Sequence, residues 1–402
     1  MLGVLCVVVL GAGCATEPER FANIPESRLA APAPSTPARL VPPVGGGETA
    51  LEIRPVAPAD PPPRVAVEDP GQAGQIPSAD PVVATAEGSV EAISKPDPQE
   101  GSGAKPLRAP AGEWLDLEEW LMARGWSTLH PVPHGRELRQ ESDGVGGTVA
   151  VMVGQKKSWW NGTQVWLGFE PRLEKGRIKV HRLDLESHFE VLMAAAAPVV
   201  LRDRSVMIDA GHGGRSVGTG SIAGNRFEKE FTLDWAERLR VLLEGKGWRV
   251  VMTRTNDVDL GLAERVALAD AAGVSLFVSL HFNSGFPNRE AAGLETYTLT
   301  PRGMASHVVR DYVDEPGRRY PNNAHDAVNL RLAIGLHRAL LATTGQTDRG
   351  VRHARFMEVL RQQQRPAVLI EGGYLSNPQE ATRVQTEAFR QKLAEAVAAG
   401  LP

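Results

Sequence analysis

Hydrophobic and polar positions alternate in blocks along the second half of the chain, from about residue 201 onward. Short β-branched apolar runs predict strands that are covered on both faces. Longer segments with apolar residues at every third or fourth position separate these runs and predict helices. The alternation is typical of an α/β domain in which a mostly parallel sheet lies between two helical layers. The predicted strands are VMIDA (206–210), WRVVMT (248–253), SLFVSL (275–280) and AVLI (367–370), and the predicted helices are 231–244, 262–272, 329–341 and 386–399.

Residues 111–200 have a different pattern, which predicts a small α+β domain. Six of the eight tryptophans lie between residues 114 and 166, and we interpret them as core residues, with stacking on sugar rings as the alternative. The domain resembles in pattern the small N-terminal domain of copper amine oxidases. The predicted elements are a helix over Leu115–Gly125 with Trp114 on its apolar stripe, strands in 146–154 and 157–169 joined at a type I′ turn by Asn161-Gly162, and a closing helix over 182–195.

The first 110 residues do not have the composition of a folded domain. Residues 15–110 carry 19 of the 30 prolines and one aromatic residue, Phe21, so we expect a disordered tether. Residues 1–14 are a short apolar run that ends in small residues, which is typical of a secretion signal. The run stops at Cys14, the position of the lipidated cysteine in a bacterial lipoprotein. We therefore expect an exported protein of the periplasm or cell envelope, with membrane attachment only through a lipid on Cys14.

Charge and cysteine content narrow the function classes. The formal net charge is −4 and the pI about 6.2, which argues against a nucleic-acid-binding protein with a basic surface. Both cysteines, Cys6 and Cys14, lie in the leader, so the predicted domains contain no thiol. Any metal in them must therefore be held by histidine and carboxylate groups.

Four ionisable residues follow or flank the predicted strands of the second domain. His212 comes two residues after the first strand, His281 follows SLFVSL directly, and Glu371 follows AVLI directly. Because loops that leave the carboxyl ends of parallel strands meet at one edge of the sheet, these side chains are expected to converge. Glu228, at the start of a helix, can reach the same edge, whereas Arg254 could equally form an ion pair with Asp257 or Asp209.

Two histidines and one carboxylate are the protein ligands of many catalytic zinc sites, which keep a fourth position for water. A second carboxylate is needed to move a proton from the water to the leaving group. His212, Glu228, His281 and Glu371 supply both sets. The residue types alone do not say which glutamate binds the metal and which moves the proton.

Five motifs together are similar to those of the zinc-dependent N-acetylmuramoyl-L-alanine amidases of the type 3 family. They are VMIDAGHGG, FEKEFTL, VSLHFNS, DRGVRHARFMEVLR and PAVLIEGGYLSNPQE, in the family's order over residues 203–400. The resemblance implies that zinc is bound by His212, Glu228 and His281 and that Glu371 is the catalytic residue. It also implies the substrate, the amide between N-acetylmuramic acid and L-alanine of the stem peptide. Ser216 stands where the family usually has Asp.

The sequence thus predicts a peptidoglycan hydrolase whose catalytic domain spans residues 201–402. Two alternatives stay open: a zinc peptidase acting on stem peptides, and a non-catalytic peptidoglycan-binding protein. Whether an activator protein is required is also open, as is the role of the 111–200 domain. We assign no function to the remaining histidines, which are His130, His134, His181, His188, His307, His325, His337 and His353.

Overall fold

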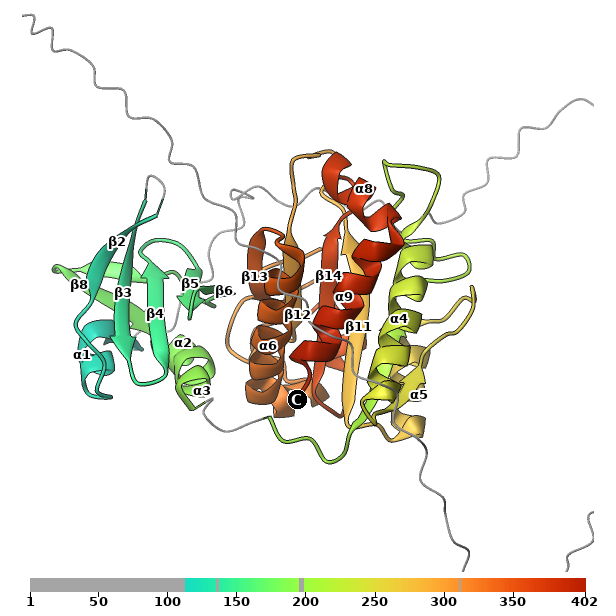
Figure 1. Cartoon of the computed structure of the whole chain (residues 1–402). Helices are drawn as coiled ribbons and strands as arrows, with labels where there is room; N and C mark the ends of the chain where they lie inside the picture. The colour runs from blue at the N-terminus through green and yellow to red at the C-terminus, as the bar shows by residue number, and fades with distance from the viewer. Residues whose placement is uncertain (1–112, 135–136, 195–198, 311) are drawn as a thin grey trace, which may run out of the picture. The chain divides into compact units, whose positions relative to one another are not determined.

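The computed structural model describes residues 113–134, 137–194, 199–310 and 312–402 (Figure 1). The predicted signal, the lipidation site at Cys14 and the proline-rich tether lie outside these residues. Among the described residues, no helix has the length and apolar character needed to cross a membrane.

The C-terminal part is built on six neighbouring strands of one sheet, in the order β10-β9-β11-β14-β12-β13. All four predicted apolar runs are strands of this sheet and pair in parallel. Two strands were not predicted, and one of them, β12, runs antiparallel to β14. The strands are β9 (Ser205–Ala210), β10 (Arg249–Met252), β11 (Leu276–Asn283), β12 (Leu294–Thr298), β13 (Asp348–His353) and β14 (Ala367–Tyr374).

Helices cover both faces of this part of the sheet, which confirms the predicted three-layer α/β fold (Figure 1). Three long helices pack on one face, and two shorter ones pack on the other. The first set is α4 (Glu228–Gly245), α6 (Asp326–Thr344) and α9 (Glu387–Gly400), the second is α5 (Leu262–Ala272) and α7 (Glu358–Arg361), and α8 (Pro378–Gln385) precedes α9.

Alternation along each strand decides which helical layer a side chain meets. On β9, Val206 and Ile208 belong to the core under α4, α6 and α9, whereas Met207 between them belongs to the core under α5 and α7. Successive strand residues point to opposite faces. Both faces are therefore apolar, and the strands read as nearly continuous apolar runs.

The N-terminal part contains a three-stranded sheet, a set of antiparallel strands and short helices. The turn at Asn161-Gly162 has φ of 50° and 77°, as the sequence predicted for this hairpin. Trp126, Trp159 and Trp160 are buried, which agrees with their interpretation as core residues. The elements are β1 (Trp114–Asp116), α1 (Leu117–Met122), β2 (His130–His134), β3 (Glu137–Gly144), β4 (Gly147–Met152), β5 (Lys157–Trp160), β6 (Thr163–Trp166), β7 (Arg172–Glu174), β8 (Arg177–His181), α2 (Arg182–Asp184), a π-helical turn (Leu185–Phe189) and α3 (Glu190–Met193).

The prediction of the first helix was wrong at its N-terminus. Helix α1 begins at Leu117, and Trp114 lies in strand β1, paired with His181 of β8. The Asp116 side chain accepts a hydrogen bond from the Glu119 amide at 3.0 Å. This N-cap satisfies a free amide of the first turn and fixes the start of the helix after Asp116.

The sheet does not end at β13, which the sequence did not indicate. Strand β6 pairs in parallel with β13 through Val165 and Val351, so the sheet continues from the C-terminal part into β6-β5-β4-β3-β2. Side chains reinforce the junction: the backbone amide of Gln164 donates to the Asp348 carboxylate at 2.8 Å, and the Trp166 indole donates to the Arg349 carbonyl at 3.0 Å. The two parts are thus joined by main-chain pairing.

Candidate metal centre and active site

The candidate site lies at the carboxyl ends of β9, β11 and β14. His281 and Glu371 are register partners on the neighbouring strands β11 and β14, and His212 lies in the loop that follows β9. The sequence placed His281 and Glu371 after their strands, but both lie inside them. Each strand continues beyond its apolar run, because the pairing of β11 with β14 extends to Asn283 and Tyr374.

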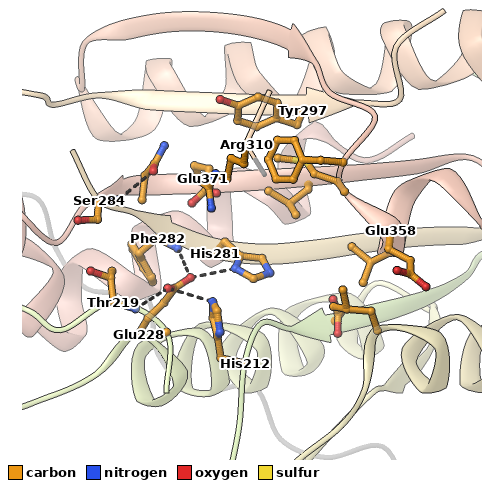
Figure 2. Close-up of a pocket in the computed structure, with 18 of the residues that line it drawn as sticks. His212, Thr219, Glu228, His281, Phe282, Ser284, Tyr297, Arg310, Glu358 and Glu371 are labelled. Carbon is orange, nitrogen blue, oxygen red and sulfur yellow. Dashed lines mark hydrogen bonds and ion pairs between the residues drawn. The ribbon is translucent and has the colours of Figure 1, made fainter. Parts of the chain in front are cut away.

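His212, Glu228 and His281 converge on one point (Figure 2). One ligand atom from each residue lies within 4.8 Å of those of the other two. Glu228 Oε2 is 3.1 Å from His212 Nε2, and Glu228 Oε1 is 2.9 Å from His281 Nδ1. The structure therefore brings together the three residues that the sequence grouped as metal ligands.

The Glu228 carboxylate is held by backbone amides as well as by the two histidines. It accepts hydrogen bonds from the Thr219 and Phe282 amides, both at 3.0 Å. Burial alone would raise the pKa of Glu228, but the charges and hydrogen bonds of His212 and His281 lower it well below its usual range. Glu228 is therefore ionised at neutral pH, as a metal ligand must be.

Two glycines leave the space that the histidines and Glu228 occupy. A Cβ atom on Gly211 would lie 2.4 Å from Cε1 of His281, and one on Gly218 would lie 2.6 Å from Oε2 of Glu228. His212 itself has φ of 62°, a left-handed conformation that costs free energy for a residue with a side chain. The surrounding structure must hold this loop in place.

Two buried arginines hold the loop that carries His212, because they donate hydrogen bonds to backbone carbonyls. Arg265 donates to the His212 carbonyl at 2.7 Å and pairs with Asp209 at 2.6 Å. Arg254 donates to the Gly211 carbonyl at 2.9 Å and the Lys229 carbonyl at 2.7 Å.

The ion pairs considered for Arg254 do not form, because Asp209 pairs with Arg265 and Asp257 with Lys229. Burial lowers the pKa of Arg254 to about 10. Arg265 was missed in the sequence, where it is one arginine within a helix without a motif signal.

Ser216 takes the position beside His212 where the family usually has Asp. Its hydroxyl lies 3.0 Å from His212 Nδ1, and the other ring nitrogen, Nε2, faces Glu228. A hydrogen bond to the outer nitrogen of a ligating histidine orients the ring. In this chain the group beside the outer nitrogen of His212 is thus a neutral hydroxyl.

Glu371 faces the same space from β14 (Figure 2). Its side chain is buried, and its Oε2 makes no hydrogen bond within the part of the chain that the structure describes. Burial raises the pKa of Glu371 to about 8, and the nearby charge of Glu228 acts in the same direction. A carboxyl group with a pKa near neutrality can both accept and donate a proton.

Next to Glu371 lies a second buried carboxylate that the sequence reasoning missed. Glu295 on β12 is the register partner of Glu371, and it pairs with Arg349 at 2.8 Å and Arg352 at 3.4 Å. Burial alone would raise its pKa, but the two arginines lower it. The LETYT run, with one carboxylate in an apolar strand, is the signal that could have located it.

A cavity of about 600 Å³ connects these groups. This is the size of a typical small-molecule site. Its wall comes from the loop after β9, from β11, β12 and β14, from the start of α7, and from residues 308–310. His212, Glu228, His281 and Glu371 all line it.

The donor set fits a metal ion of the zinc type. Two imidazole nitrogens and one carboxylate oxygen are the ligands of several catalytic zinc sites. The glycines leave room for them, Glu228 is ionised, and Oε2 of Glu371 in the same cavity has no hydrogen-bond partner among the described residues. The described residues contain no other group of three or more such side chains that could hold a metal ion.

The sequence matches the family model of N-acetylmuramoyl-L-alanine amidases over residues 206–402. N-acetylmuramoyl-L-alanine amidase AmiA of Salmonella typhimurium is 33% identical over 221 residues, which cover 49% of this chain and 75% of AmiA. The uncharacterised protein YqiI of Bacillus subtilis is 34% identical, over 52% of this chain and 86% of YqiI. The solved catalytic domain of CwlV from Bacillus (Paenibacillus) polymyxa is 33% identical, covers 49% of this chain and 96% of that domain, and has a TM-score of 0.40.

The matched residues contain the whole site, including His212, Glu228, His281 and Glu371. The class that the matches define is the peptidoglycan amidases. The chain belongs to the N-acetylmuramoyl-L-alanine amidase family.

Proposed function

We propose that this protein hydrolyses the amide between N-acetylmuramic acid and L-alanine of the stem peptide, with zinc held by His212, Glu228 and His281. The observation that supports this most directly is the convergence of the three side chains beside Glu371 in one cavity. The relatives named above include amidases with this specificity in their names. The metal identity and the residue roles are part of the proposal.

Glu371 is the proton carrier in this mechanism. A zinc ion bound at this site would lower the pKa of a water molecule and polarise the carbonyl under attack. Glu371 takes a proton from the attacking water as the water oxygen bonds to the carbonyl carbon. It then gives the proton to the leaving nitrogen as the C–N bond breaks, which yields a lactyl carboxylate and a free L-alanine amine.

The other site residues position these groups. Arg254 and Arg265 hold the loop that carries His212. Ser216 orients the His212 ring, and the backbone amides of Thr219 and Phe282 orient Glu228. These contacts keep the ligands in place without a metal, so little reorganisation is needed on binding.

The product distinguishes this function from the two alternatives. The full chain is incubated with intact wall and purified muropeptides, with chelator and then with added zinc, and the products are identified by mass spectrometry. Stems that begin at L-alanine, lost with chelator and restored by zinc, are expected. Cleavage within the stem would indicate a peptidase, and wall binding without release would indicate a binding protein or a missing activator.

Glu371→Gln is the matched variant for this assay. It is expected to lose turnover while it still binds zinc, since the amide cannot carry the proton but does not touch the three ligands. Full activity in this variant would refute the assigned role of Glu371.

We further propose that the protein acts outside the cytoplasm, because its substrate is there. The leader over residues 1–14 supports export, and Cys14 is the position at which a lipid would be attached. Metabolic labelling with a palmitate analogue, compared between the wild type and Cys14→Ala, tests the anchor. Equal labelling would exclude Cys14.

A further inference from the structure

Two arginines line the cavity, and they differ in what they contact. Arg265 is buried, and its Nη1 and Nη2 atoms donate to Asp209 and to the carbonyls of Ala210 and His212. The Arg310 side chain is exposed, and it makes no hydrogen bond or ion pair to any other residue that the structure describes. The guanidinium carbon of Arg310 lies 5.1 Å from the centroid of the Phe356 ring.

Arg310 lies on the Glu371 side of the cavity. Figure 2 draws it beside Glu371, in the direction of Tyr297. Its positive charge favours the ionised form of Glu371 and counters part of the rise that burial causes in the pKa of that carboxyl. A cation at this position faces the space that a substrate bound for reaction at Glu371 must enter.

The segment that carries Arg310 is fixed by buried contacts. Arg355, which is fully buried, donates to the carbonyls of Pro301 and Met304 at 2.9 and 2.7 Å. Three residues before Arg310, the His307 amide donates to the His353 carbonyl, and His307 Nδ1 accepts from the His353 amide, both at 2.9 Å. His307 Nε2 lies 2.9 Å from the Leu167 carbonyl. The arginine is thus presented from an anchored segment.

Three other carboxylates of the cavity wall already form ion pairs with arginines other than Arg310. Asp209 pairs with Arg265, Glu295 with Arg349 and Arg352, and Glu358 with Arg361. A guanidinium presents a fork of donors that matches a carboxylate with two hydrogen bonds. Arg310 therefore has the chemistry of a receptor for a carboxylate that comes with the substrate.

We propose that Arg310 is a specificity-determining residue that binds the free α-carboxylate of the second stem residue, the one that follows L-alanine. This rests on the proposed function, which places the scissile amide beside Glu371. In peptidoglycan stems the second residue is D-glutamate linked through its γ-carboxyl, so its α-carboxylate is either free or amidated. That residue is the next one along from the scissile nitrogen, about 4–7 Å away.

Two ligands that differ only in this group test the proposal: N-acetylmuramoyl-L-alanyl-D-glutamate and N-acetylmuramoyl-L-alanyl-D-isoglutamine, each with its γ-carboxyl converted to an amide, as it is in the stem. The full-length protein is loaded with zinc, and kcat/KM is measured for each. The wild type is expected to prefer the acid, and Arg310→Ala to lower kcat/KM for the acid about tenfold. Loss of the Arg310 charge also acts on Glu371, and that effect is common to both ligands. The readout is therefore the ratio of kcat/KM for the acid to kcat/KM for the amide, which should fall in Arg310→Ala and be retained in part in Arg310→Lys.

Arg319→Ala is the matched control, since Arg319 is exposed in the same region but does not line the cavity. It is expected to behave as the wild type. Equal losses on both ligands in Arg310→Ala, or a wild type without preference, would overturn the proposal.

Binding to the zinc-loaded Glu371→Gln protein separates this proposal from the proposed function. Calorimetric titration with the two ligands does not require turnover. The subsite is supported if Glu371→Gln binds the acid more tightly than the amide and the double variant Glu371→Gln/Arg310→Ala binds both equally. This holds even if the wild type hydrolyses neither ligand. Equal binding of acid and amide contradicts the subsite, even if the wild type is an active amidase.

Discussion

Burial of an acid, as at Glu371, couples protein stability to pH. Folding raises the pKa of this carboxyl from its ordinary value of 4.5 to about 8. The folded state therefore holds the proton more tightly than the unfolded state. The resulting stabilisation is fully present below pH 4.5 and is lost as the pH rises through about 8.

Metal-free wild-type protein is accordingly expected to lose stability relative to Glu371→Gln as the pH rises from about 5 to about 8.5. Glutamine resembles the protonated carboxyl and does not ionise. Thermal unfolding of both proteins in chelator, across this pH range, measures the difference in Tm. Glu174→Gln, at an exposed position of β7, serves as the control. A difference that does not change with pH would show that Glu371 does not titrate in this range.

Ser216 gives a second test at the residue scale, this time of metal binding. Ser216→Ala removes the hydroxyl that lies 3.0 Å from His212 Nδ1. Because such contacts orient ligating histidines, the zinc affinity is expected to fall about tenfold or more. Ser216→Thr keeps the hydroxyl and should retain the affinity. Competition with a chromophoric chelator measures both, and an unchanged affinity in the alanine variant would exclude an orienting role.

Among the elements, the loop between β9 and α4 depends on close packing around the site. Gly211 has an ordinary φ, so alanine is excluded there only by the His281 ring, 2.4 Å from the added Cβ. Gly220, in the same loop, has nothing closer than 3.8 Å. The two positions therefore separate crowding of the site from a general effect of alanine in the loop.

Gly211→Ala is expected to displace His281, lower the zinc affinity about tenfold or more, and destabilise the fold by about 1–3 kcal/mol. Gly220→Ala should change neither quantity. Chelator competition and denaturant unfolding provide the measurements. Normal zinc affinity in Gly211→Ala would show that the ring can move without cost.

At the scale of the whole molecule, the junction between β6 and β13 connects the N-terminal part to the site. Trp166 donates to the Arg349 carbonyl, and the Arg352 guanidinium lies 4.2 Å from its ring centroid. Both arginines pair with Glu295, the register partner of Glu371. The N-terminal part therefore supports the wall of the cavity, whatever else it binds.

Trp166→Ala is expected to lower the free energy of unfolding by about 1–3 kcal/mol and also to lower kcat/KM on purified muropeptides. Trp120→Ala is the control, since Trp120 stacks on Arg124 and contacts Phe189 within the N-terminal part. It should reduce stability while kcat/KM at a temperature well below its Tm is retained. If both variants lose activity equally, the junction has no special link to the site.

The alternation of strands and helices and the four key side chains could be predicted from the sequence. Apolar periodicity reports burial residue by residue, so β9, β11, β14 and the main helices were recognisable. Convergence of His212, His281 and Glu371 followed from parallel strands, whose carboxyl ends share one edge. The domain boundaries of the N-terminal half and the roles of the site residues remain predictions.

Other features depend on contacts between residues far apart in the chain, for which local pattern carries no signal. The pairing of β6 with β13 joins Val165 to Val351, and Arg265 supports His212 from another element. The roles of Glu295 and Arg310 depend on their surroundings in the folded protein. Glu295 is neutralised by two arginines, whereas the Arg310 side chain has no ion-pair partner among the described residues. The kinds of chemical group and their order along the chain are readable from the amino-acid sequence. The tertiary structure decided which of them are paired and which face the substrate, because burial and charge compensation arise only when distant segments pack together.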